Sequence, residues 1–86
     1  MSFRVKRTRE IYRTAFKHGI TKADIKHVLR HATRIIDQDD GSLLYLGAAT
    51  TGKLLEVVTY PRPDGSELVV HAMKMRPRYA NLLPRE

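Results

Sequence analysis

The chain of 86 residues contains no cysteine, and this absence excludes several classes of protein. Without cysteine there is no disulfide framework, no cysteine-ligated zinc site and no thiol nucleophile. Hydrophobic runs are also short: the longest nearly apolar stretch, residues 43–49, is far below the roughly 18 residues that a membrane span requires. The basic N-terminus lacks the apolar segment of a secretory signal. We therefore expect a soluble, cytoplasmic protein with no membrane association.

Familiar catalytic and metal-binding motifs are absent as well. There is no glycine-rich phosphate loop and no Gly-x-Ser-x-Gly nucleophile turn. His27 and His31 have the i, i+4 spacing of a metal-ligating pair, but Val28 stands where a metalloprotease has glutamate. Neighbouring cations at Arg30 and Arg34 would repel a divalent ion. We expect no metal and no cofactor.

Positive charge is the main feature that is present. Lysine and arginine number 16 against 9 acidic residues, which gives a net charge of +7 and an isoelectric point near 10.2. Residues 1–34 carry a net charge of +8 and residues 73–86 carry +3, whereas residues 35–72 carry −4. A basic surface attracts phosphate backbones, and an isoelectric point above 9 favours a nucleic-acid partner. The alternative interpretation is that these charges form an ordinary hydrated protein surface and indicate no particular partner.

The length indicates one domain over residues 1–86, and its N-terminal third predicts two helices. Residues 8–18 have apolar side chains at helical spacing, with Gly19 placed to end the helix in a left-handed conformation. Residues 22–32 form a stronger pattern, with Thr21 as N-cap. The apolar stripe of this second helix consists of Ile25, Val28, Leu29 and Ala32.

The remaining chain predicts strands. Alternating or apolar segments separated by turn residues indicate four strands, at residues 34–37, 43–47, 53–60 and 66–75. Short loops between them imply an antiparallel meander. Pro77 could begin a short C-terminal helix or tail. We therefore expect an α+β fold, with two N-terminal helices packed on a four-stranded antiparallel sheet.

The fourth predicted strand carries the most informative residues. Strand alternation places His71 on the face of Val69, and Lys74 on the opposite face. Both faces are mainly apolar, so this strand is expected to be central, where a histidine is either a hydrogen-bonded core residue or a catalytic group. A cationic string with an aromatic residue then follows, formed by Lys74, Arg76, Arg78 and Tyr79. Such cations can hold phosphates, and the tyrosine either stacks on a base or anchors the tail.

Five stretches in this order resemble bacterial toxins of the BrnT type, within the RelE-like group of toxin–antitoxin ribonucleases. They are Lys17-His18-Gly19-Ile20, the helix through Ile25 and Val28, Leu44-Tyr45-Leu46-Gly47, the segment Gly52 to Val58, and Val70-His71-Ala72-Met73-Lys74. The similarity spans roughly residues 16–79. A neighbouring family of uncharacterised domains with the same helix–helix–sheet order is similar too.

The resemblance implies the toxin component of a type II toxin–antitoxin system, a metal-independent endoribonuclease that inhibits translation. Its partners would be RNA, with ribosome-associated mRNA among the candidates, and a cognate antitoxin protein. The chain departs from the BrnT pattern Ile-Ser-Ala-Arg-Lys in its last strand, where His71 replaces the serine and Met73 replaces the arginine. If that arginine stabilises the transition state, Arg76 or Arg78 must substitute for it in an active enzyme.

Metal-free RNA cleavage needs a base, an acid and cations that stabilise the phosphorane. Histidine suits proton transfer because its ordinary pKa, near 6.5, is close to working pH. We assign one proton-transfer role to His71 and the other to His18 or Lys74. Arg76 and Arg78 are expected to hold phosphate through their planar guanidinium groups. His18 has a structural alternative, since a histidine at a helix end can bond the last carbonyls.

A different class of function also fits the composition. A non-catalytic nucleic-acid-binding module would use the cationic face of the second helix rather than the fourth strand. That face consists of Lys26, His27, Arg30, His31 and Arg34. Under this alternative, charge reversal at Arg30 and Arg34 should weaken binding most, and His71 should affect only stability.

Overall fold

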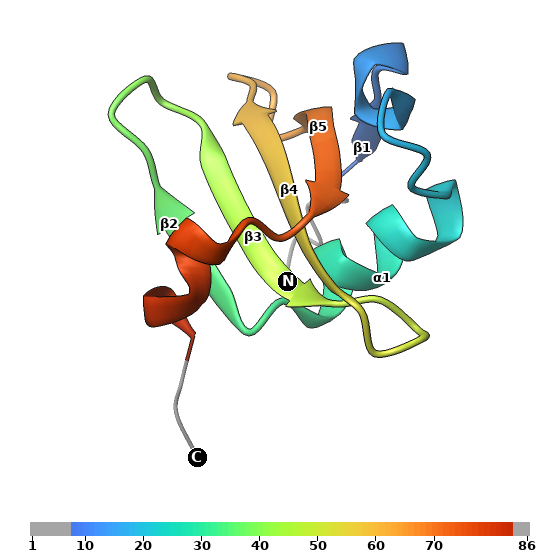
Figure 1. The fold of residues 1–86 in the computed structure, drawn as a ribbon. Helices are drawn as coiled ribbons and strands as arrows, with labels where there is room; N and C mark the ends of the chain where they lie inside the picture. Colours follow the sequence, from blue (N-terminus) through green and yellow to red (C-terminus); the bar gives the residue numbers. More distant parts are fainter. Residues whose placement is uncertain (1–7, 84–86) are drawn as a thin grey trace, which may run out of the picture.

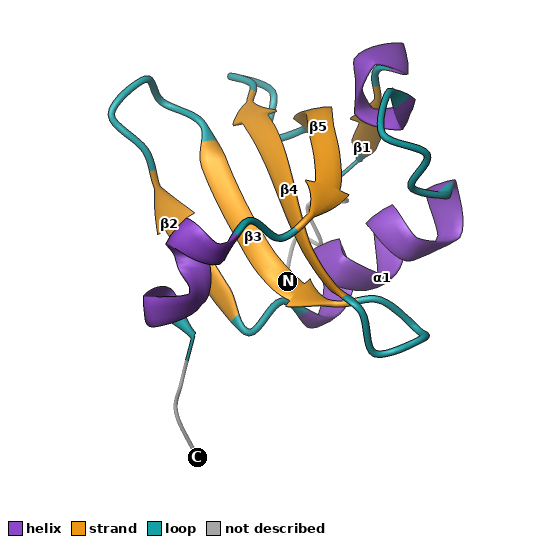
Figure 2. Cartoon of the chain, viewed as in Figure 1, coloured by secondary structure: helices purple, strands orange, loops and turns teal. Residues whose placement is uncertain are grey.

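The computed structural model describes residues 8–83, which form one mixed β-sheet with helices on both of its faces (Figures 1 and 2). The strands are β1 (Arg9–Ile11), β2 (Arg34–Asp37), β3 (Leu43–Ala48), β4 (Leu54–Pro61) and β5 (Glu67–Lys74). The helices are α1 (Lys22–His31) and the 3₁₀ helices η1 (Arg13–Phe16) and η2 (Pro77–Leu82). Within the described residues, no helix is long and apolar enough to cross a membrane.

The sheet has five strands in the order β1-β5-β4-β3-β2. Strands β2 to β5 form the antiparallel meander that their short loops predict, and they match the four predicted strand segments closely. β1 adds to the free edge of β5 in parallel orientation. The predicted fold class is therefore wrong in two respects: the sheet is five-stranded and mixed, and a single α-helix, not two, precedes the meander.

The error lies in residues 8–18, which the side-chain spacing assigned to a helix. In the structure, Ile11 pairs with Val69 across the edge of β5, and the Tyr12 amide donates to the Val69 carbonyl at 2.8 Å. Only η1 retains helical geometry, and it buries Ala15. A strand edge without a partner leaves its backbone groups available, so a distant segment can gain hydrogen bonds that local helix spacing does not anticipate.

The α1 helix matches its prediction and covers one face of the sheet, near β3 and β4. Thr21 caps it by accepting from the Asp24 amide at 3.2 Å. The core between helix and sheet contains Ala15, Ile25, Val28, Leu29, Tyr45, Ala49, Leu55, Val57, Val69 and Ala72. The sheet and the end of α1 lie especially close together at Gly47 of β3, where an added Cβ would be 3.1 Å from the Cα of Ala32.

One buried carboxylate belongs to this core. Glu67 accepts hydrogen bonds from the Tyr45 hydroxyl and from the Thr59 hydroxyl, the latter at 2.8 Å. The Nε atom of Arg9 lies 3.3 Å from its other oxygen. Burial acts to raise the pKa of the Glu67 carboxyl, but these donors hold it below its usual value. The carboxylate therefore remains charged and stabilises the junction of β1 and β5.

A β-bulge changes which residues of β5 share a face. Val58 pairs with His71 and Thr59 with Val69, so Val70 is left without an opposite residue. The extra residue reverses the alternation. Val69 and Ala72 both face α1, and His71 lies on the other face with Met73. The sequence prediction that His71 shares a face with Val69 is therefore wrong.

The face of the sheet away from α1 is covered by the C-terminal segment. Figure 1 shows the chain leaving β5, crossing in front of β4 and β3, and forming η2 over the β2 side. Leu44, Leu46 and Glu56 project from this face and are almost completely buried. The extended strand conformation does not continue through Pro77, because β5 ends at Lys74 and Arg76 caps η2. This turn places Arg76 above the middle of the sheet.

Candidate functional site

The candidate site is organised around Glu56, a carboxylate in the middle of β4 with 0% of its surface exposed. Its side chain lies on the face away from α1, since the adjacent Leu55 and Val57 belong to the core under the helix. A charged group in such a position is expensive to bury unless donors surround it. The residues that supply those donors define the site.

Arg76 and His71 satisfy the Glu56 carboxylate. Oε1 accepts from the Arg76 backbone amide and from Arg76 Nε, both at 3.0 Å. Oε2 accepts from Arg76 Nη2 at 2.8 Å and lies 3.2 Å from His71 Nε2. Arg76 therefore pairs with the carboxylate in a bidentate fashion, a geometry that the rigid guanidinium favours. This pair fixes the position of η2 relative to β4.

The donors determine the charge state of the carboxylate. Burial acts to raise the pKa of Glu56, but the hydrogen bonds from the side chain and backbone of Arg76, together with that from His71, hold it below its usual value. The same ion pair raises the pKa of Arg76 above its ordinary value. Glu56 is therefore ionised near neutral pH and can only accept hydrogen bonds.

This charge state determines the tautomer of His71. Because the carboxylate only accepts, the Nε2 atom that faces it must carry a proton, and in the neutral ring Nδ1 then holds the lone pair. The His71 side chain is 28% exposed, so it is reachable from solvent. A buried carboxylate that orients a partly exposed imidazole is an arrangement suited to a general base.

A second imidazole lies beside the first. The ring of His18 contacts that of His71 edge to face, with a centroid separation of 5.6 Å and an interplanar angle of 78°. His18 is exposed and follows η1, which is held against β5 by a hydrogen bond of 2.7 Å from the Thr14 hydroxyl to the Val70 carbonyl. Two residues far apart in sequence, both assigned proton-transfer roles, are thus brought together.

Lys74, the alternative partner for His71, lies elsewhere. It pairs with Leu55 at the end of β5 and so projects from the face that Ala72 and α1 share. The structure does not bring it to His71, because side chains alternate along a strand and these two residues, three positions apart, point to opposite faces. Of the two candidates named for the second proton transfer, only His18 lies beside His71.

Arg78 and Tyr79 lie next to Arg76 on η2. Arg78 Nη2 donates to the Tyr79 hydroxyl at 2.8 Å, and its guanidinium carbon is 4.8 Å from the centre of the tyrosine ring. Arg76 approaches the same ring, at 5.7 Å. Both cations therefore already interact with Tyr79, so a base that stacked on this ring would compete with a guanidinium.

The cationic face of α1 forms a separate surface. Lys26, Arg30 and His31 of α1 are exposed, and Arg34, which the sequence placed on the same helix face, is instead the exposed first residue of β2. His27 differs, since it is half-buried and its Nδ1 lies 3.0 Å from the Ala48 carbonyl oxygen. Its ring also contacts that of His31, with centroids 4.7 Å apart. Within residues 8–83, no three histidine or acidic side chains are grouped so as to hold a metal ion.

Sequence reasoning did not select Glu56. The signal was available in the segment Leu54 to Val58, where one glutamate interrupts an otherwise apolar strand. A carboxylate in a strand buried on both faces requires a cationic or hydrogen-bonding partner. The partner itself could not be named, because Arg76 reaches Glu56 only through the turn after β5.

Comparison with known proteins gives one positive result. The model of a domain of unknown function, DUF4258, matches residues 8–74, which run from β1 to the end of β5. His18, Glu56 and His71 fall inside the matched region, and Arg76 follows it. No curated protein and no solved structure matches the chain. Since the matched region covers most of the sequence, the chain belongs to the DUF4258 family.

Proposed function

We propose that this protein is a cytoplasmic, metal-independent endoribonuclease, the toxin of a bacterial type II toxin–antitoxin system related to the BrnT and RelE-like toxins. RNA, mRNA on the ribosome included, is its substrate, and a cognate antitoxin is its protein partner. The observation that carries the proposal is the contact between His18 and His71, with His71 oriented by the buried Glu56 carboxylate. The high positive charge supports an RNA substrate.

The chemistry follows from the atoms at the site. The Nδ1 atom of His71 accepts the proton of a ribose 2′-hydroxyl while the 2′-oxygen bonds to the adjacent phosphorus. The bond from phosphorus to the 5′-oxygen breaks, and a protonated His18 donates a proton to that oxygen. The products are a 2′,3′-cyclic phosphate and a 5′-hydroxyl. Because the two rings touch, the phosphate lies beside the pair rather than between its members.

Arg76 supplies positive charge near the reacting phosphate without being free to move. Its Nε–H and one N–H of Nη2 are engaged by Glu56, so Nη1 and the second N–H of Nη2 remain for a phosphate oxygen. A cation held in place before the reaction stabilises developing negative charge without reorganisation. Arg76 thereby supplies the transition-state charge that the BrnT pattern assigns to an arginine, in whose place this chain has Met73.

The test is cleavage of an end-labelled RNA in EDTA. We expect wild type to produce fragments ending in a cyclic phosphate, and His71→Asn to lower the rate at least about 100-fold, as the loss of a general base does. His31→Asn is the matched control, because it makes the same exchange on α1, and it should retain activity. Both variants should show wild-type circular dichroism.

If purified RNA stays intact, the same set of proteins is added to a translating ribosome extract. A block of translation that depends on His71 supports a ribosome-dependent enzyme. Intact RNA and unimpaired translation in both assays would refute the ribonuclease proposal.

The exposed cations of α1 and of the start of β2 favour a second candidate, a non-catalytic nucleic-acid-binding module. Under this candidate, RNA or DNA is retarded in a gel but not cleaved, and an Arg30→Glu, Arg34→Glu double variant abolishes the shift. His71→Asn would then leave binding unchanged. The two candidate functions are therefore distinguished by whether RNA cleavage depends on His71 or nucleic-acid binding depends on Arg30 and Arg34.

A further inference from the structure

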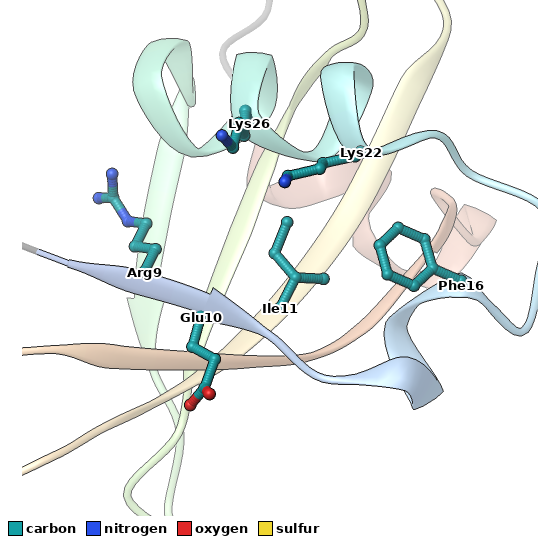
Figure 3. Close-up of a pocket in the computed structure, with 6 residues that line it drawn as sticks. All are labelled: Arg9, Glu10, Ile11, Phe16, Lys22 and Lys26. Atoms are coloured by element: carbon teal, nitrogen blue, oxygen red, sulfur yellow. The ribbon is translucent and has the colours of Figure 1, made fainter.

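An open groove of about 500 Å³ lies between the edge strand β1 and α1, on the sheet face opposite to His71 (Figure 3). It is lined by Arg9, Glu10, Ile11, Phe16, Lys22 and Lys26. Neither the resemblance to toxins nor the candidate catalytic site accounts for it. Three of its lining residues are cations, and two offer apolar surface.

The cations gather on the rim, where only Arg9 is partly compensated, because its Nε lies 3.3 Å from the buried Glu67 carboxylate. Figure 3 shows the charged ends of Arg9, Lys22 and Lys26 above the groove and the Glu10 carboxylate turned away from it. Glu10 is instead paired with Arg62, at 2.9 Å. Within the part of the chain that the structure describes, neither lysine forms an ion pair, so their charge is available to an anion.

The apolar part of the groove lies beside the cations. Ile11 forms its floor, and Phe16 presents its ring from the end of η1 with 40% of its surface exposed (Figure 3). An exposed ring next to cations matches a nucleotide, which combines a phosphate with an aromatic base. An acidic peptide would use the cations but has no need of the ring.

We propose that this groove binds one nucleotide unit of a single-stranded RNA, its phosphate among Arg9, Lys22 and Lys26 and its base against Phe16. The inference rests on RNA being the substrate and adds a subsite to that function. Phe16 and His18 are two residues apart, and His18 contacts His71. An RNA strand passing over the segment 17–21 would therefore reach both the groove and the catalytic pair.

The experiment is an NMR titration of ¹⁵N-labelled protein with a 2′-O-methylated tetranucleotide, which cannot be cleaved because its 2′-oxygens carry no proton. We expect the amides of Ile11, Phe16 and Lys26 to shift. Lys26→Gln should raise Kd about fivefold and reduce the dependence on salt by roughly one phosphate contact. Its matched control, Lys53→Gln, removes the same charge from the turn before β4 and should change Kd less than twofold.

A second pair of variants tests the ring. Phe16→Leu keeps an apolar side chain and should weaken binding about fivefold through loss of stacking. Tyr12→Leu removes another exposed ring, outside the groove, and should have little effect. All four variants alter exposed side chains, and thermal unfolding checks that they remain folded.

The outcomes separate this proposal from the proposed function. Binding of the tetranucleotide in the groove by a protein that cleaves no RNA in either cleavage assay supports the groove and contradicts only the enzyme. Cleavage that depends on His71 but is unaffected by Lys26→Gln and Phe16→Leu would overturn the groove alone. Adenosine monophosphate is the second probe. Binding as tight as that of the tetranucleotide would overturn the assignment to an RNA strand, and absence of shifts in the groove would overturn the site.

Discussion

Replacement of Glu56 by glutamine removes a single negative charge from the centre of the sheet while keeping the shape of the side chain. The carboxylate accepts three hydrogen bonds from Arg76 and a fourth from His71. A glutamine can present one oxygen to these donors, and its amide nitrogen then faces N–H groups that need an acceptor. The substitution thus leaves a cation above the sheet without its counterion.

The expected cost is large for a domain of this size. A hydrogen bond to a charged group contributes about 1.5–3 kcal/mol, and breaking a buried ion pair costs about 3–5 kcal/mol. Water weakens the pair here, because the Arg76 side chain is 41% exposed. We therefore expect Glu56→Gln to lower the free energy of unfolding by about 2–4 kcal/mol, measured by urea denaturation at pH 7.

Control and pH dependence make this prediction specific. Glu10→Gln makes the same exchange in an exposed ion pair and should change stability by less than about 1 kcal/mol. Because the folded-state pKa of Glu56 is depressed, its carboxylate stabilises the protein above the unfolded-state pKa, near 4.5, and this stability is lost as pH falls through the lower folded-state value. The difference in the free energy of unfolding between wild type and Glu56→Gln should therefore become smaller below about pH 4.

The result that would refute the reasoning is equally definite. A Glu56→Gln variant as stable as Glu10→Gln would mean that the carboxylate contributes no net stabilisation to the fold. A gap that stays constant from pH 7 to pH 3 would mean that ionisation of Glu56 is not its source.

The other two stability predictions concern the α1 side of the sheet. Gly47→Ala should lower the free energy of unfolding by about 1–3 kcal/mol, measured by urea denaturation. The reason is that the new Cβ would lie 3.1 Å from the Ala32 backbone and overpack the contact between helix and sheet. A variant as stable as wild type would show that α1 can move away at no cost. Tyr45→Phe should cost about 1–2 kcal/mol, since buried Glu67 loses one of its donors. That loss should shrink as pH falls below the unfolded-state pKa of glutamate, near 4.5, and through the lower folded-state pKa of Glu67, because a protonated Glu67 no longer needs the donor. A loss that does not change with pH would point to packing instead.

Local chemistry predicted the elements that depend on neighbouring residues. The helix at 22–31 follows from its cap and apolar stripe, and the four antiparallel strands follow from alternation and turn residues. Gly19 has the positive φ, +77°, that its position after a helical segment predicted. Each of these features is determined within about ten residues, so sequence patterns can identify it.

Contacts between residues far apart in the sequence account for the differences between the predicted and the observed fold. Residues 9–11 form a strand because the edge of β5 offers them partners more than fifty residues away. The bulge at Val70 arises from the register of β5 against β4, and it moves His71 to the face of Glu56. No local pattern encodes either pairing.

The candidate site shows the same division. The sequence by itself determined which groups are available: four histidines, His18 and His71 among them, a string of arginines, a strongly basic composition and no cysteine. Only the tertiary structure decided that His18 contacts His71, that Glu56 orients it, and that Lys74 lies on the other face. The physical reason is that side-chain identity sets what chemistry is possible, whereas strand register, a single bulge and the turn into η2 set which side chains meet.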